Sequence, residues 1–203
     1  MTAWISMISD ADANADLIDA LKLARTPHGT VDNVMRVHSH RPNTMRGHLA
    51  LYRAALHDES NCIPEWLQET IASYVSILND CDYSLANHWA NARHLIDDNN
   101  RADKIEAALH ADSPDTVFAG AELAYMHYAK KLTLTPQAMQ QSDVEELKKA
   151  GINDGEILEA NQIIGYFNYV NRLLNGLGVT TEGDTVGYYA SSDSDGNQLG
   201  SEQ

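Results

Sequence analysis

The amino-acid sequence predicts an all-α protein. Apolar residues recur at helical spacing in one segment after another, and no segment shows sustained alternation bounded by hairpin turns. Prolines and capping residues divide these segments into lengths typical of globular helices. The chain has 203 residues, 43% of them hydrophobic, which is enough for one compact domain. We therefore expect one helical domain over residues 1–180, with antiparallel packing of its helices.

Charge and hydropathy exclude several classes of partner. There are 29 acidic and 14 basic residues, so the formal net charge is −15. Nucleic acids and anionic membrane surfaces would repel such a chain. No apolar run approaches the length of a bilayer span, and the acidic residues at 10, 12 and 16 do not suit a signal peptide. We expect a cytoplasmic protein with neither a nucleic-acid nor a membrane partner.

The N-terminal region is expected to hold three helices. Residues 9–24 alternate polar and apolar groups at helical spacing, and Ser9 or Asp10 can cap this helix. A short second helix follows Thr30, and Pro42 suits the first turn of a third. The predicted buried stripe of the first helix consists of Leu17, Ile18 and Leu21.

Three histidines lie in this region, His38, His40 and His48. No acidic residue or cysteine accompanies them at a recognised metal-ligand spacing. We expect these imidazoles to be solvated near helix ends.

The rest of the domain is expected to be helical as well. Pro64 begins a helix over residues 65–78, and a second runs from Cys81 to Ile96 after a break at Asn79-Asp80. Further helices are expected over residues 101–111, 113–132, 142–150 and 154–175. Residues 181–203 are rich in Gly, Ser and Asp, so we expect a flexible polar tail there.

Four polar side chains surround the break at Asn79-Asp80. Ser84 and His88 follow Cys81 by three and seven residues, offsets that place all three side chains on one face of a helix. Glu69, on the preceding helix, comes alongside them if the chain reverses tightly at the break. We therefore expect a thiol, a hydroxyl, an imidazole and a carboxylate to share one catalytic pocket.

The spacing of Glu69, Cys81 and His88 resembles the active-site pattern of the AhpD-like alkylhydroperoxidases, in the carboxymuconolactone decarboxylase superfamily. Three further segments resemble its peroxidase-related branch: HSHRPNTMRGHLALYRAAL at 38–56, KLTLTP at 131–136 and YFNYVNRLLNGLGV at 166–179. The resemblance covers residues 25–180. It implies an AhpD-like helical fold, assembly as a homo-oligomer (dimer, trimer or hexamer), and no requirement for a metal or an organic cofactor.

The sequence departs from this family at one decisive position. In the family, the second cysteine of a Cys-x-x-Cys pair attacks the peroxide, the first resolves it, and the histidine and glutamate relay a proton. Here the attacking cysteine is replaced by Ser84, and a hydroxyl cannot cycle through a sulfenic acid and a disulfide. The resemblance therefore implies reduction of a hydroperoxide through Cys81 alone, with an external thiol as reductant.

The reactivity of Cys81 stays open. A helix N-terminus lowers the pKa of a thiol, whereas the flanking carboxylates of Asp80 and Asp82 raise it.

Two other functions remain possible. Glu69 and His88 can form an acid–base relay acting on a small organic acid, as in the lyase members of the superfamily, with Tyr83 and Ser84 binding the substrate. Within that relay Ser84, four residues before His88, is a conceivable nucleophile. The other alternative is a non-catalytic oligomer, in which the thiol, imidazole and carboxylate could bind a soft metal ion.

Overall fold

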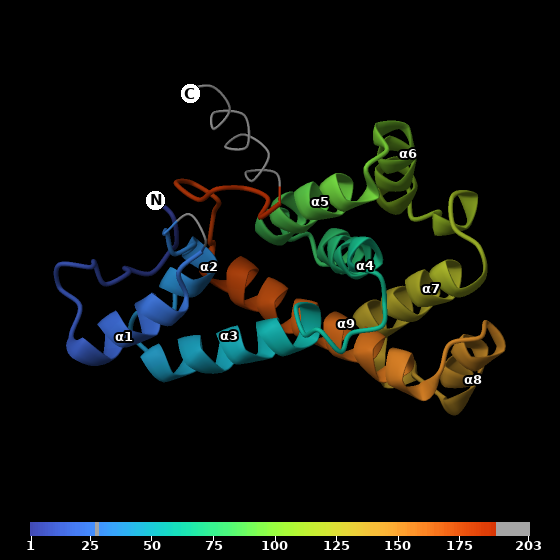
Figure 1. Cartoon of the computed structure of the whole chain (residues 1–203), viewed down its shortest axis with the longest axis horizontal. Helices are drawn as coiled ribbons and strands as arrows, with labels where there is room; N and C mark the ends of the chain where they lie inside the picture. The colour runs from blue at the N-terminus through green and yellow to red at the C-terminus, as the bar shows by residue number, and fades with distance from the viewer. Residues whose placement is uncertain (27–28, 190–203) are drawn as a thin grey trace, which may run out of the picture.

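The structure is a computed structural model that describes residues 1–26 and 29–189, and throughout that part of the chain the regular elements are helices (Figure 1). The α-helices are α1 (Ala15–Leu23), α2 (Asn33–Arg36), α3 (Pro42–Leu56), α4 (Glu65–Leu78), α5 (Asp82–Ile96), α6 (Asn99–His110), α7 (Gly120–Leu134), α8 (Gln141–Lys149) and α9 (Asp154–Leu177). Two short 3-10 helices, η1 (Pro114–Thr116) and η2 (Pro136–Ala138), flank α7. The prediction of an all-α fold is confirmed. None of the described helices is long and apolar enough to cross a membrane.

Buried apolar side chains form two separate clusters. The smaller cluster joins α1, α2 and α3 through Leu17, Ala20, Leu21, Ala24, Val31, Met35, Met45 and Leu49. The larger cluster is built mainly from α4 to α9. Val34 and Tyr52 pack against both clusters, so they mark the seam between them. Figure 1 shows α1–α3 at one end of the molecule, with α9 running along the long axis toward them.

The turn between α4 and α5 is the predicted tight reversal. Asp80 adopts a left-handed backbone conformation, with φ of 49°. The amide of Cys81 then donates to the carbonyl of Ser76, at 2.9 Å, which closes the end of α4. Along α4 several small residues are fully buried, among them Ala72, Ser73 and Ser76. Because these side chains are short, α5 can pack closely against α4 as an antiparallel partner.

Helix α9 has strong signals at both ends. Asn153 caps its start by accepting from the amides of Gly155 and Glu156. Its end lies at Gly178, where φ is +58°. A Cβ at this position would also overlap the ring of Trp4, so glycine is required there on two grounds. The helix delivers Tyr166, among other residues, to the centre of the molecule.

Two helix boundaries differ from those expected. Helix α1 begins at Ala15 and is capped by Asn14, whereas Ser9 bonds to Asp12 in the preceding turn. The helix expected over 113–132 is split, because the chain turns after η1 to bury Phe118 and starts again at Gly120. Since Asn, Ser and Asp are all good caps, composition alone did not choose among them.

Residues 181–189, which we call the C-terminal strap, differ from the flexible tail expected from residue 181. The carboxylate of Asp184 accepts from the amide of Asn33 and from the hydroxyl of Tyr83. The amide of Tyr188 donates to the side chain of Asn91, at 2.7 Å. Polar bonds therefore order this segment, although it buries few aliphatic groups. The remainder of the expected tail, residues 190–203, lies outside the described residues.

Candidate functional site

The predicted meeting of Glu69 and His88 is present. Nδ1 of His88 lies 2.6 Å from Oε2 of Glu69, and the Glu69 side chain is buried, with 3% of the residue exposed. Nδ2 of Asn91 donates to the other carboxylate oxygen, at 3.2 Å. The ring of Phe167 packs edge-on against the imidazole, with centroids 4.6 Å apart. These contacts fix the imidazole, and no described residue bonds to its Nε2 atom.

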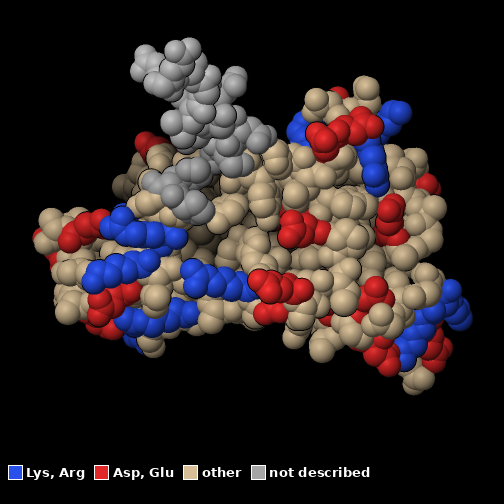
Figure 2. Space-filling model, viewed as in Figure 1, with Lys and Arg blue, Asp and Glu red and all other residues tan. Residues whose placement is uncertain are grey.

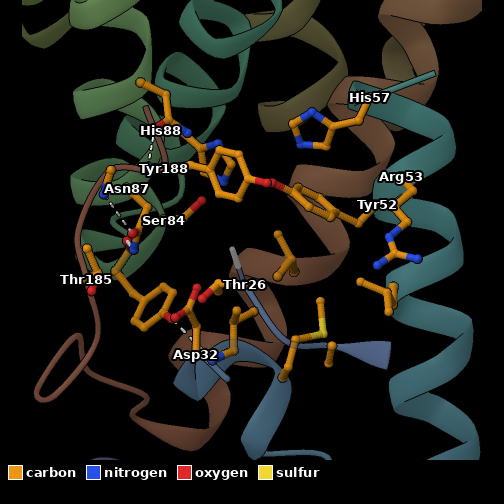
Figure 3. Close-up of a pocket in the computed structure, with 18 of the residues that line it drawn as sticks. Thr26, Asp32, Tyr52, Arg53, His57, Ser84, Asn87, His88, Thr185 and Tyr188 are labelled. Atoms are coloured by element: carbon orange, nitrogen blue, oxygen red, sulfur yellow. Dashed lines mark hydrogen bonds between the residues drawn. The ribbon is translucent and has the colours of Figure 1, made fainter. Parts of the chain in front are cut away.

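His88 lines a cavity of about 210 Å³ that lies at the seam between the two apolar clusters. Helix α3 and α2 form one side, and α5, α9 and the C-terminal strap form the other (Figure 3). Its apolar wall includes Ala24, Val34, Met35, Leu49, Val170 and Leu174. Polar and aromatic groups line the rest, including Tyr52, His57, Tyr83, Asn87, Tyr166 and Tyr188. A small, mostly apolar cavity with a few convergent polar groups is typical of a ligand site.

Ser84 also lines the cavity, but its hydroxyl is engaged elsewhere. The Oγ atoms of Ser84 and Ser76 are 2.9 Å apart, and Ser76 Oγ is 2.8 Å from the carbonyl of Ala72. A hydroxyl carries one proton, so when Ser76 donates to Ala72, Ser84 donates to Ser76. No described hydrogen bond joins Ser84 to His88. The arrangement therefore lacks the serine–histidine contact that an activated serine nucleophile requires.

Cys81 lies at the N-cap of α5 and is 1% exposed. It is not among the residues that line the cavity. Burial raises the pKa of the Cys81 thiol to about 11, and the charge of Asp82 raises it further, although the backbone amide of Ser84 bonds to the sulfur and opposes this shift. Of the four predicted site residues, Glu69 and His88 are bonded to each other, and Ser84 and His88 share the cavity. Cys81 stands behind its wall.

Sequence reasoning missed several cavity residues, notably Tyr52 and His57 at the end of α3, Tyr166 on α9, and Tyr188. Figure 3 shows Tyr52 and Tyr188 pointing toward each other from opposite sides of the cavity. Tyr52 and Tyr166 occur in segments that resemble family signatures, which was the available signal. No signal marked Tyr188, because it lies in a segment whose composition is typical of a tail.

The expectation that the N-terminal histidines are solvated is wrong for two of them. His38 and His48 are 7% and 3% exposed. They bond to each other, Nε2 of His38 to Nδ1 of His48, at 2.9 Å. The outer nitrogen of His48 is 2.8 Å from the hydroxyl of Tyr166, 118 residues away in the sequence. Because every ring nitrogen has a partner, these imidazoles can be buried without an unsatisfied polar atom.

The C-terminal strap is connected to the acid–base pair through one side chain. Asn91 donates to Glu69 through its Nδ2 atom and accepts from the amide of Tyr188 through its Oδ1 atom. Asn87, one turn earlier on α5, accepts from the amide of Gly187, at 3.4 Å. The segment that covers the cavity is therefore bonded to the same carboxamide that donates to the buried carboxylate.

Metal ligation was one of the open alternatives. In the part of the chain that the structure describes, no group of three or more His, Cys, Asp or Glu side chains is placed to hold a metal ion.

Comparison with known proteins assigns the class of fold. No protein-family model and no curated protein matches the sequence. Solved structures match over most of the chain, and they define an AhpD-like helical fold, as the sequence resemblance implied.

Three such structures illustrate the match. An uncharacterized peroxidase-related protein from Ralstonia eutropha JMP134, described as an alkylhydroperoxidase AhpD core, has a TM-score of 0.74 at 21% identity, covering 89% of this chain and 93% of its own. A peroxidase-related protein from Silicibacter sp. TM1040 has a TM-score of 0.75 at 21% identity, covering 88% and 91%. The debrominase Bmp8, in complex with 2,3,4-tribromopyrrole, has a TM-score of 0.71 at 18% identity, covering 96% and 98%. At these identities the likeness establishes the fold.

Proposed function

We propose that the protein is a non-redox acid–base enzyme, which moves a proton on a small organic molecule held in the cavity at the seam. The observation that carries this proposal is the Glu69–His88 pair, bonded at 2.6 Å, beside a cavity whose described lining includes no cysteine. His88 is the residue that takes and returns the proton, and Glu69 is the residue that orients it.

The geometry suits general acid–base catalysis. When Nδ1–H donates to Glu69, the Nε2 atom carries the lone pair, so the hydrogen bond selects the basic tautomer. Nε2 then removes a proton from the ligand, and the resulting imidazolium returns it to another atom of the ligand or to water. Asn91 holds the second oxygen of Glu69, which prevents the carboxylate from turning away from the ring.

The cavity wall indicates the kind of ligand. Its volume of about 210 Å³ and its aromatic lining fit a small ring or a short branched acid. Two guanidinium groups, Arg25 and Arg53, line the cavity with one carboxylate, Asp32, and this balance favours an anionic ligand. The debrominase Bmp8, which has the same fold, is described in complex with a small aromatic ring, 2,3,4-tribromopyrrole. These features support a ligand of similar size here.

Reduction of a hydroperoxide through Cys81, the function implied by the family resemblance, has less support. The thiolate is the reactive form of cysteine, and with a pKa of about 11 only about one thiol in ten thousand is ionised near neutral pH. The sulfur is also separated from the cavity, where a peroxide would bind. Homo-oligomeric assembly, an external thiol reductant and a cytoplasmic location stay predictions.

The test uses proton exchange, because this readout is the same whichever product the enzyme forms. The wild-type protein is incubated in deuterated water with a panel of small carbon acids that carry a carbonyl or carboxylate group, and loss of the C–H signal is followed by NMR. We expect exchange of at least one compound, and a decrease of roughly 10²–10⁴-fold in His88→Gln, the range for loss of a general base. Cys81→Ala is the matched control and should retain exchange.

The opposite pattern would replace this proposal. If the protein consumes an organic hydroperoxide with dithiothreitol, and Cys81→Ala abolishes this turnover while no compound of the panel exchanges a proton in the wild type, the thiol route is the function. Exchange that persists unchanged in His88→Gln would likewise remove His88 from the reaction.

A further inference from the structure

A chain of hydrogen bonds leads from the cavity to the protein surface through side chains that the acid–base pair does not use. The hydroxyl of Tyr166, which lines the cavity, is 2.8 Å from Nε2 of His48. Nδ1 of His48 is 2.9 Å from Nε2 of His38, and Nδ1 of His38 is 2.9 Å from Oγ1 of Thr44. Thr44 is exposed, whereas the two imidazoles and Tyr166 are buried. The chain therefore joins the ligand site to bulk water.

Both imidazoles of this chain are neutral. Burial lowers the pKa of His38, and burial together with the neighbouring His38 lowers the pKa of His48 to about 3. A neutral imidazole has one N–H group and one acceptor nitrogen. Since each ring nitrogen bonds to the next group in the chain, both rings must carry their proton on the nitrogen of the same name, Nδ1 or Nε2. The chain consequently has a direction, and only two proton orders are possible.

The two orders present opposite faces of Tyr166 to the cavity. In the outward order, Thr44 donates to the carbonyl of Arg41, 2.8 Å away, both imidazoles carry Nδ1–H, and Tyr166 donates to His48. Tyr166 then offers only lone pairs to a ligand. In the inward order, Thr44 donates to His38 and both imidazoles carry Nε2–H. The proton of Tyr166 is then free to bond to a ligand oxygen.

We propose that Tyr166 is the second proton-exchanging residue of the cavity, and that the chain Thr44–His38–His48 reverses its proton order to make Tyr166 a donor or an acceptor toward a ligand oxygen. This inference rests on the proposed function, because it assumes that the ligand exchanges a proton in this cavity. The ligand class that it indicates is an enol, phenol or ketone, whose oxygen alternates between protonated and unprotonated forms.

The transfer balances without a charged intermediate left in the protein. The ligand oxygen binds the proton of Tyr166 through its own lone pair, and the electrons of the broken O–H bond stay on the Tyr166 oxygen. Tyr166 takes the proton from Nε2 of His48, Nδ1 of His48 takes the one from Nε2 of His38, and Nδ1 of His38 takes the hydroxyl proton of Thr44. Thr44 regains a proton from water. One proton enters from solvent, one reaches the ligand, and the chain changes from the inward to the outward order.

The reversal avoids the main cost of a buried proton pathway. An isolated imidazolium in a buried site is strongly unfavourable because it loses its hydration. In a concerted shift each ring gains one proton as it loses another, so neither ring has to hold a charge. The ring of Tyr169, 5.5 Å from that of His48, and the ring of Tyr166, at 5.6 Å, confine the imidazole between them and keep it aligned with its two partners.

The experiment reads the histidine tautomers directly. Full-length protein labelled with ¹⁵N-histidine is studied by long-range ¹H–¹⁵N correlation near neutral pH, with His38→Gln and His48→Gln used for assignment. The probe is pentafluorophenol, which is ionised under these conditions and is followed by its ¹⁹F signal. We expect His38 and His48 to be neutral and of the same tautomer, and the bound phenolate to place both protons on Nε2.

Variants separate this proposal from the proposed function. Tyr166→Phe, which keeps the ring, should abolish the tautomer response and weaken binding of the phenolate about tenfold, the effect of losing one hydrogen bond to a charged oxygen. His88→Gln should leave the tautomer response intact while proton exchange is lost. If His88→Gln loses exchange but the wild-type tautomers do not respond to the bound probe, the acid–base function stands and the relay is wrong. Opposite tautomers, a charged ring, or absence of probe binding to the wild type would each overturn the relay.

Discussion

The N-terminal region, residues 1–56, and the remainder of the chain differ in charge and in the kind of core that they form. Residues 1–56 contain six basic and five acidic side chains, so the remaining 24 acidic and eight basic residues carry the whole negative charge. Figure 2 shows basic side chains gathered over α1 and α3 on one face of the molecule. The N-terminal region also has its own small apolar cluster, separate from the larger one.

The comparison teaches how the site is divided. The larger region supplies the acid–base pair, on α4 and α5, where close helix packing fixes the geometry. The N-terminal region supplies the opposite wall, both arginines of the cavity and the buried histidine chain. A ligand therefore lies between a larger acidic body and a smaller, nearly neutral one. Sites at such boundaries are common, because the seam leaves space that neither core fills.

The largest expected effect comes from restoring a dithiol in the larger region. Ser84→Cys recreates Cys-x-x-Cys at the start of α5, with the new sulfur lining the cavity. Such pairs have thiol pKa values near 7, about four units below that of Cys81, so the reactive thiolate fraction should rise by roughly a thousandfold or more. Consumption of an organic hydroperoxide with dithiothreitol measures this gain. Ser84→Ala is the control, and equal rates in both variants would show that the pocket does not support thiol chemistry.

A second prediction tests whether the two clusters are separate cooperative units. Met45→Ala in the small cluster and Ile163→Ala in the large one each remove a fully buried side chain, at an expected cost of about 2–5 kcal/mol. We expect Met45→Ala to speed native-state hydrogen exchange in α1–α3 alone, and Ile163→Ala to speed it throughout the molecule. Faster exchange of α4 and α9 in Met45→Ala would show that the molecule opens as one unit.

A third prediction concerns acid sensitivity, which should originate in the N-terminal region. His48 has a folded-state pKa of about 3, below its ordinary value of 6.5, so the unfolded chain binds one more proton between these values. The free energy of unfolding is therefore fully supported above pH 6.5 and falls by about 1.4 kcal/mol per pH unit as the pH decreases toward 3. Urea unfolding between these limits should show a shallower pH slope in His48→Gln, and no change of slope in the exposed-site control His40→Gln.

The smallest effect is expected at Cys81. Because its sulfur lies outside the cavity, Cys81→Ala should change proton exchange by less than about twofold and lower the free energy of unfolding by about 1 kcal/mol, for loss of a small buried group. Exchange that falls as strongly as in His88→Gln would place the thiol in the reaction after all.

The residues of α4 and α5 show what the sequence could predict. The meeting of Glu69 and His88 depends on helical offsets and one tight turn, and both are local properties that the sequence displays. Cys81 was expected on the same face as Ser84 and His88, but it precedes the helix. Its φ of −109° and ψ of 87° are not helical, so the helical offset does not describe where its side chain points.

Long-range pairings could not be predicted in the same way. His48 and Tyr166 are 118 residues apart, and nothing in either segment shows that their side chains meet. The C-terminal strap was missed for a different reason. Composition measures how much apolar surface a segment can bury, whereas this segment is held by hydrogen bonds to Asp184 and to Asn91, which composition does not reveal.

The amide of Asn91 makes ligand exchange and chemistry dependent on each other. A molecule that enters or leaves past Tyr188 must separate its amide from Asn91, and the same carboxamide steadies the carboxylate of Glu69. An enzyme built in this way is fully aligned only while its cargo is enclosed. Loosening the cover would shorten the dwell time of the cargo and, at the same moment, blunt the base that acts on it.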